Sequence, residues 1–278
     1  MSPLNSSYSN TTDSNRCYEN DFSKTCWTVI TVICCLLGLP ASMLVLRELL
    51  QRQRSSDFFM FNLTTNDVLF LCVIPFSILN TQLWHTEQIE WIDNFLDGLC
   101  LCSRPLFMSC ICAECYFAVV YPIMYMASRR GLTIRKITTV LIWFSTIGFS
   151  LVKRLKTETL TFSFNATPLL IALPVITFCD ISVLRALKKT DPSGNTNIHP
   201  QKKQIFLIIT NSFIMTVFVY LPSVISFLIS GLGPNSLKCI SEGLGYAFSM
   251  TGSFIMPILY LDSVGKLQSL KELWRKYI

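Results

Sequence analysis

The chain has 278 residues, of which 51% are hydrophobic and 14% are charged, and its mean hydropathy is +0.47. This composition leaves too little polar surface for an ordinary soluble globular protein. The net charge of +6 would suit a nucleic-acid-binding protein, but the basic residues are spread over several loops rather than gathered on one soluble face, so membrane orientation explains them better.

Seven long apolar segments follow one another along the chain. A helix needs about 20 apolar residues to cross the hydrocarbon core, because no water is available there for unpaired backbone groups. We therefore predict an all-α fold: an extracellular tail over 1–25, a seven-transmembrane helix bundle over 26–261 and a short amphipathic cytosolic helix over 262–278. The predicted spans are Cys26–Leu46, Phe58–Asn80, Phe95–Tyr125, Ile137–Val152, Ala166–Leu187, Ile205–Ser230 and Gly243–Leu261.

Most of the 23 Lys and Arg residues lie in segments that face the cytosol if the N-terminus is outside. Basic residues resist translocation, so this distribution predicts an outside N-terminus in a multi-pass plasma-membrane protein. The loop with Lys153, Arg154 and Lys156 runs against the trend. The first 25 residues lack the basic-then-apolar layout of a cleaved signal peptide, so we expect the first span to act as the targeting signal.

The predicted outer segments contain candidate glycosylation sites. Asn5 and Asn10 in the tail and Asn165 in the second outer loop all begin the Asn-x-Ser/Thr pattern.

Twelve cysteines are many for this length, yet most lie inside apolar runs, where packing as a small hydrophobic residue is the ordinary role. Cys17, Cys26 and Cys239 are the candidates on the outer side. A bridge between Cys17 and Cys239 would tie the tail to the third outer loop, and unpaired thiols or another pairing stay open.

Short motifs occur in order along the spans. They are Gly38-Leu39-Pro40, Asn62-Leu63 followed by Asp67, Glu114-Cys115-Tyr116 with Pro122, Trp143, Pro174, Pro222 and Pro257-Ile258-Leu259-Tyr260. Together they make the chain resemble class A, rhodopsin-like G-protein-coupled receptors over essentially all seven helices. The Gly-Leu-Pro motif is similar to that of the nucleotide-, protease- and lipid-responsive branch.

Four positions depart from what that resemblance implies. Ser42 stands in place of an asparagine, Cys115 in place of the helix-three arginine, Tyr220 in place of a helix-six tryptophan, and Met256 in place of Asn/Asp before a proline. Relatives also pin the second outer loop to helix three with a disulfide. No cysteine lies between Ala127 and Phe178, so this chain cannot form that bond.

Asp67 and Arg104 are ionisable residues within predicted spans. A charge at this depth costs about 2.5–3.5 kcal/mol on insertion scales, so such groups usually pair or line a wet cavity. By the resemblance, Asp67 matches a sodium-binding aspartate and Arg104 matches a small polar residue of the same site. We predict that the Arg104 guanidinium takes the place of sodium and neutralises Asp67, aimed by a local distortion at Pro105. The alternative is that Arg104 snorkels or faces a watery cleft.

Asp97 lies two helical turns outward from Arg104 on nearly the same face. By the resemblance it occupies the place where amine receptors hold their ligand-binding aspartate. Contact with a cationic ligand and pairing with Lys153, Arg154 or Lys156 both remain open.

The resemblance assigns an inner switch to Glu114, Cys115, Tyr116 and Tyr260. Cys115 cannot imitate the permanently charged contact of an arginine, which puts ordinary G-protein activation in question. Glu114 loses its partner in the same helix, leaving Arg129, Arg130 or solvent as substitutes.

In the sixth span, Pro222 predicts a bend, and Tyr220 is a candidate aromatic toggle, with simple packing as the alternative. After Asp262 the spacing of Val264, Leu267, Leu270 and Leu273 among basic residues predicts a helix lying on the inner leaflet.

No nucleophile–base constellation, metal-ligand spacing or phosphate loop stands out, so we expect neither an enzyme nor a bound cofactor or metal. The chain is expected to be a cell-surface receptor that binds an extracellular ligand of unknown type and signals to a heterotrimeric G protein. A non-signalling decoy of the same fold is one alternative. A seven-helix transporter or channel is another, against which stand the lack of an internal repeat and the sparse charge within the spans.

Overall fold

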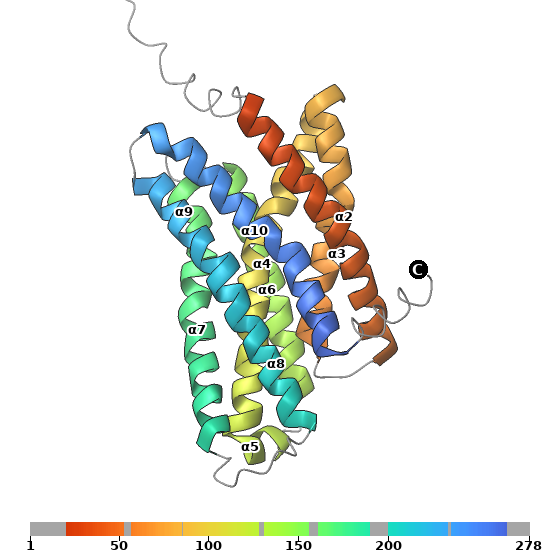
Figure 1. The fold of residues 1–278 in the computed structure, drawn as a ribbon, viewed down its shortest axis with the longest axis vertical. Coiled ribbons are helices and arrows are strands. Elements are labelled where there is room, and N and C mark those ends of the chain that lie inside the picture. Colours follow the sequence, from red (N-terminus) through yellow and green to blue (C-terminus); the bar gives the residue numbers. More distant parts are fainter. Residues whose placement is uncertain are drawn as a thin grey trace, which may run out of the picture.

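The computed structural model describes residues 21–52, 57–84, 86–127, 131–155, 161–189, 200–232 and 235–265. All the regular elements in these ranges are helical (Figure 1). They are α2 (Asp21–Arg52), α3 (Phe58–Leu79), the π-helical turn η2 (Asn80–Trp84), α4 (Glu87–Val120), α5 (Pro122–Ala127), α6 (Gly131–Leu155), α7 (Thr161–Lys189), α8 (Pro200–Met215), the π-helical turn η4 (Thr216–Tyr220), α9 (Leu221–Leu232) and α10 (Asn235–Ser263).

Seven helices in the described residues are long and apolar enough to cross a membrane, which confirms the predicted all-α bundle of seven spans. The third span differs most from its prediction. It begins at Glu87 instead of Phe95 and runs for 34 residues as α4. At a rise of about 1.5 Å per residue, such a helix is longer than the hydrocarbon core of about 30 Å. Its polar first turns therefore extend beyond the apolar segment that hydropathy detects.

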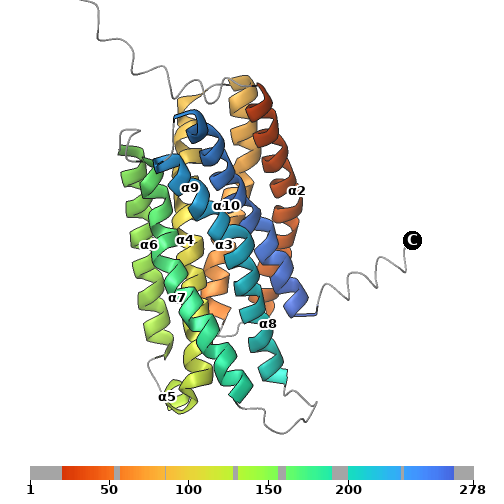
Figure 2. The same cartoon turned by 60° about the vertical axis from the view of Figure 1, so that its left-hand side comes forward.

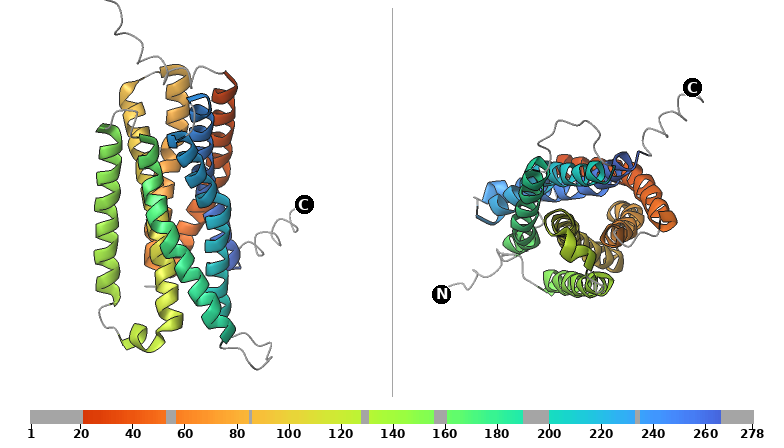
Figure 3. Two further views of the ribbon diagram at one scale, coloured as in Figure 1. Left: turned by 90° about the vertical axis from the view of Figure 1, so that its left-hand side faces the viewer. Right: turned by 90° about the horizontal axis from the view of Figure 1, so that it is seen from below.

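Helix α4 occupies the middle of the bundle (Figures 1 and 2). It packs against α3, α6 and α7, and also contacts α8, while α10 lies between α2 and α9. The view along the bundle shows α6 at the outside, against α4 (Figure 3). Charged groups on α4 can therefore meet partners from several helices.

The sixth span is built from α8, η4 and α9. Pro222 has no backbone N–H, and its ring would clash with the carbonyl four residues earlier in a regular helix. The chain widens to a π-helical turn just before this proline, where the Leu221 N–H bonds to the Thr216 carbonyl oxygen. The predicted irregularity at Pro222 is therefore a widened turn centred on Thr216–Tyr220.

We call the end of the bundle that contains Glu114 the inner end, because the sequence predicts that it faces the cytosol. Helix α10 finishes there at Ser263, and Gly265 follows with a φ of 77°. The Gly265 N–H bonds to the Asp262 carbonyl oxygen over 2.9 Å, which is a common way to end a helix. The amphipathic helix predicted to follow falls mostly on 266–278, outside the described residues.

Candidate functional site

Three ionisable side chains of α4 each form an ion pair with a neighbouring helix. Asp97 pairs with Lys153 of α6, Arg104 with Asp67 of α3, and Glu114 with Arg135 of α6. They lie at successive levels along α4, so each level of the bundle contains one pair. We refer to them as the outer, central and inner pairs.

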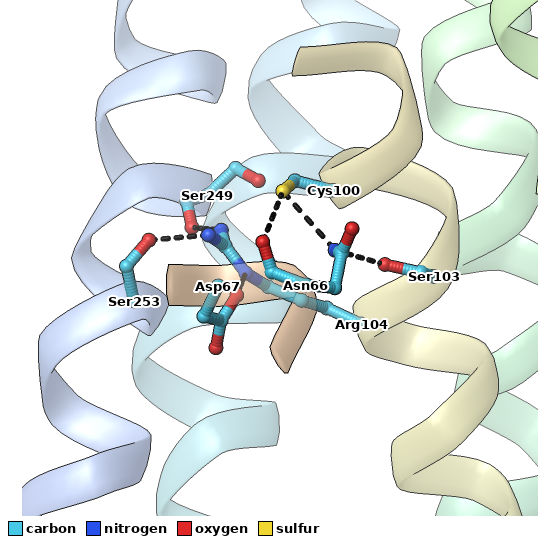
Figure 4. A network of polar contacts seen from close by, with 7 residues as sticks. All are labelled: Asn66, Asp67, Cys100, Ser103, Arg104, Ser249 and Ser253. Carbon is cyan, nitrogen blue, oxygen red and sulfur yellow. Dashed lines mark hydrogen bonds and ion pairs between the residues drawn. The ribbon is translucent and has the colours of Figure 1, made fainter. Parts of the chain in front are cut away.

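The central pair is deeply buried. Arg104 Nε donates to Asp67 Oδ1 over 2.7 Å, and the two side chains are 5% and 2% exposed. The other two guanidinium nitrogens bind α10: Nη1 donates to the Ser249 carbonyl oxygen over 2.8 Å, and Nη2 donates to Ser253 Oγ (Figure 4). The Phe70 ring of α3 lies 5.7 Å from the guanidinium carbon. One arginine thus links α3, α4 and α10.

An amide network adjoins the central pair on the α3–α4 contact. Asn66 Nδ2 donates to Ser103 Oγ over 2.7 Å and lies 3.2 Å from Cys100 Sγ (Figure 4). Our sequence reasoning missed Asn66 and Ser103, as well as both serines of α10 that bind Arg104. A signal was available, because Asn66 and Ser253 are polar residues inside apolar runs, where a polar group needs a partner.

The outer pair joins α4 to α6. Lys153 Nζ lies 2.6 Å from Asp97 Oδ2, with the side chains 11% and 20% exposed. The ammonium also lies 5.0 Å from the centre of the Tyr246 ring of α10, within the range of a cation–π contact. Of the partners considered for Asp97, the one in contact is Lys153. The side chain of Arg154 and all of Lys156 lie outside the described residues.

Asn165 is the one sequence-predicted modification site that the structure contradicts. It lies within α7 rather than in a loop and is fully buried. Its Nδ2, the atom that would carry a glycan, donates to the Tyr246 hydroxyl over 2.8 Å. A glycan needs surface exposure, so Asn165 does not fit a glycosylation site. Asn5, Asn10 and Cys17, and the side chain of Cys239, lie outside the described residues.

The inner pair joins α4 to the start of α6 and to α5. Arg135 Nε donates to Glu114, and Arg135 Nη2 donates to the Tyr125 hydroxyl over 2.5 Å. Partial burial raises the pKa of Tyr125 above its usual value. We considered Arg129, Arg130 or solvent as the partner of Glu114. Both arginines fall outside the described residues, and the structure pairs Glu114 with Arg135, the fifth residue of α6.

The other predicted switch residues are placed as follows. Cys115 is a half-buried free thiol one position after Glu114. The Tyr116 ring packs against Phe178 of α7 with ring centres 5.7 Å apart. Tyr260 is a half-buried member of the main apolar core, and Tyr220 is 4% exposed in η4. Pro222 follows Tyr220 in the first turn of α9.

No group of His, Cys, Asp and Glu in the described part of the chain has the geometry to hold a metal ion. At the centre of the bundle, the space around the Asp67 carboxylate is occupied by the Arg104 guanidinium instead. The arrangement can therefore neutralise charge and connect helices without an added cation.

Comparison with known proteins finds similarity over part of the chain. The profile described as "7 transmembrane receptor (rhodopsin family)" matches residues 42–168. Two purinoceptors, both named purinoceptor 3, from Meleagris gallopavo and Gallus gallus, are 24% and 23% identical to the chain over 148 residues. Each alignment covers 48% of this chain and 43% of the relative, which is less than half of the relatives' length. All six residues of the three ion pairs lie within residues 42–168.

Proposed function

We propose that the chain is a rhodopsin-like, class A seven-transmembrane receptor that binds an extracellular ligand and passes a helix rearrangement to an intracellular G protein. The observation that carries the proposal is the receptor-family match over residues 42–168, which contain the second, third and fourth spans of a seven-helix bundle and parts of the first and fifth. The three ion pairs on α4 suggest how such a rearrangement would be controlled. Each of them holds α4 to another helix, so relative motion of these helices must stretch or exchange a charged contact.

The central pair would replace the sodium ion that the family resemblance places beside Asp67. A guanidinium is permanently charged and presents five donors in a fixed plane, so it can serve a carboxylate and α10 at the same time. The contacts of Arg104 with Asp67, Ser249 and Ser253 support this role. A soluble cation can leave when a receptor changes state, whereas Arg104 is attached to α4. We therefore expect the helix rearrangement to be independent of the sodium concentration.

The outer pair contains the candidate contacts for the ligand. Asp97 would be the residue to contact a cationic ligand, but Lys153 already neutralises it. A ligand that binds Asp97 must displace Lys153, and one that binds Lys153 must displace Asp97. The ligand therefore needs a cationic group for Asp97 or an anionic group for Lys153, to compensate for the ion pair that is lost. Both relatives are named purinoceptors, which makes purine nucleotides the first compounds to test. Their phosphates carry the charge that would compete with Asp97 for Lys153.

A second candidate, a non-signalling receptor of the same fold, is favoured by one observation. Cys115 is a neutral thiol where the resemblance implies an arginine that contacts the intracellular partner. Glu114 is held by Arg135 at the same time, so the acidic residue of the motif is also engaged. A receptor with this inner end would fold and bind ligand without engaging a G protein.

A G-protein dissociation assay in cells that display the full chain at the surface tests the proposal. Wild type and Cys115→Arg are compared across the G-protein classes, with and without purine nucleotides, and Ile123→Arg, which adds an arginine at an exposed position of α5 outside the spans, serves as the control. Signal from wild type above that of untransfected cells supports a signalling receptor. Signal from Cys115→Arg alone identifies the second candidate, and silence of both variants at equal surface level contradicts the first.

Orientation is tested separately with epitope tags at the two chain ends. A seven-span receptor with its N-terminus outside exposes the N-terminal tag on intact cells and the C-terminal tag only after permeabilisation. Both tags in one compartment would contradict the proposed topology.

A further inference from the structure

Asp180 is a buried acidic residue of α7 that belongs to none of the three ion pairs. It is 4% exposed and faces α4 and α8 near the inner end. Its Oδ2 accepts a hydrogen bond from Ser212 Oγ of α8 over 2.8 Å, and the same hydroxyl lies 3.0 Å from Cys112 Sγ of α4. We call Asp180, Ser212 and Cys112 the inner carboxyl network. It connects three helices through one side chain from each.

The surroundings of Asp180 do not suit a negative charge. Within the described residues, its Oδ1 has no hydrogen-bond partner, and no Lys, Arg or His forms an ion pair with it. Asp67, Asp97 and Glu114, the acidic members of the three ion pairs, each have a cation beside them. An ionised carboxylate taken out of water without a partner is far more costly than a neutral acid, which loses only ordinary hydrogen bonds.

The groups around Asp180 are all neutral or weakly acidic. Helix α4 contributes Cys112 and Cys115, α7 itself contributes Cys179, and α8 contributes Ser212. Tyr220 of η4 lies toward Arg104 and Asp67 instead. Helix α9, which also packs on α7, has no ionisable side chain. None of these groups supplies the positive charge that an ionised Asp180 would need.

We propose that Asp180 is a proton-binding site: it holds a proton while α4, α7 and α8 are packed as in this structure, and releases it to cytosolic water when α8 separates from α7. Separation breaks the bond from Ser212 and lets water reach both carboxyl oxygens, so the carboxylate becomes the favoured form. The packed arrangement therefore binds one proton more tightly than the separated one.

The sign of the pH effect follows from this difference. The state that binds more protons is favoured at low pH, so acid stabilises the packed inner end and alkali favours separation. A single proton changes the ratio of the two states by at most about tenfold per pH unit. The inference rests on the helix rearrangement of the proposed function and adds a proton as a ligand that shifts it, and its test needs neither the extracellular ligand nor the G protein.

The test follows α8 directly in purified full-length protein in lipid nanodiscs. A trifluoromethyl-phenylalanine in place of Phe206, an exposed residue of α8, reports the populations of its positions by fluorine NMR without using the native cysteines. For wild type we expect the second population to grow with pH, with a slope of up to about tenfold per unit. In Asp180→Asn, which keeps a neutral side chain at every pH, the packed population should persist unchanged. Equal pH dependence in wild type and Asp180→Asn, or none in wild type, would overturn the proposal.

Two control variants and one spectroscopic measurement complete the design. Asp262→Asn removes an exposed carboxylate at the same end, and Ser223→Ala removes a buried hydroxyl that donates to the Val219 carbonyl oxygen of the same span; both should keep the wild-type pH dependence. Infrared spectra of wild type with isotope-labelled aspartate should show the carbonyl band of a neutral carboxyl at about pH 6, where exposed aspartates are ionised, and lose it on alkaline titration. This measurement tests the proposal even where Asp180→Asn does not fold, because it uses wild type alone. Absence of the band in wild type would overturn the proposal.

Discussion

Arg104 Nε and Asp67 Oδ1 are 2.7 Å apart, and both side chains are almost completely buried between α3, α4 and α10. The pair costs desolvation free energy on folding, but removal of one partner is worse, because the other charge is then buried alone. The stability of the bundle should therefore depend on the match between the two residues more than on either one.

The first prediction concerns this match. Arg104→Gln should lower the free energy of unfolding by about 3–5 kcal/mol and retain the protein inside the cell, because Asp67 is left without a cation. The double variant Asp67→Asn/Arg104→Gln should recover part of the loss. Surface immunolabelling and the Tm in detergent measure both effects, with Arg47→Gln, an exposed arginine of α2, as the control. A single variant that matches wild type in both assays would contradict a structural role for the pair.

The second prediction is independence from sodium. Because the guanidinium occupies the position beside Asp67, exchange of NaCl for KCl at equal ionic strength should leave the Tm of wild type unchanged. Arg104→Ser should instead gain stability from sodium but not from potassium, since ligand binding to the native state alone raises stability. Preferential stabilisation of wild type by sodium would show that the site still takes an ion.

The sequence was sufficient for the spans and for the candidates of the central pair, for different physical reasons. Hydropathy detects a membrane span because lipid leaves the backbone no other partner, and two ionisable residues in such spans need each other or water. The partners on α10 could not be deduced, because a serine hydroxyl or a carbonyl has no distinctive pattern. Arg135 was not among the partners considered for Glu114, for a related reason: several arginines follow Glu114 in the chain, and only the packing of α6 selects Arg135. Asn165 was placed in a loop because α7 begins with polar residues that hydropathy does not count as helix.

The third prediction concerns the outer pair. Lys153→Met and Asp97→Asn should each destabilise the protein, and their double-mutant cycle should give a coupling of about 0.5–3 kcal/mol, since the two charges are in contact and largely buried. Equilibrium unfolding of the four variants in one lipid mixture provides the measurement. Additive effects would mean that the contact between Nζ and Oδ2 contributes nothing to stability.

The fourth prediction concerns the inner pair. Glu114→Gln should free Arg135 and loosen α5, because Arg135 holds both Glu114 and the Tyr125 hydroxyl. Limited proteolysis at the inner end should become faster, while Tyr125→Phe, which keeps the ion pair, should have a smaller effect. If Glu114→Gln leaves the cleavage rate unchanged, the ion pair does not order this end of the bundle.

The fifth prediction rests on the packing of α10 against α9. A Cβ added at Gly245 would lie 2.7 Å from Phe227 Cε1, and the Phe227 ring is fully buried, so it has little room to move. Gly245→Ala should therefore lower the free energy of unfolding by about 1–3 kcal/mol through overpacking.

Gly148→Ala is the matched control, because nothing lies within 4 Å of its added Cβ on the exposed side of α6. There the gain in helix propensity should stabilise the protein by about 0.5–1 kcal/mol. The two variants should thus shift the Tm in opposite directions, and a shift of the same sign would contradict close packing at Gly245.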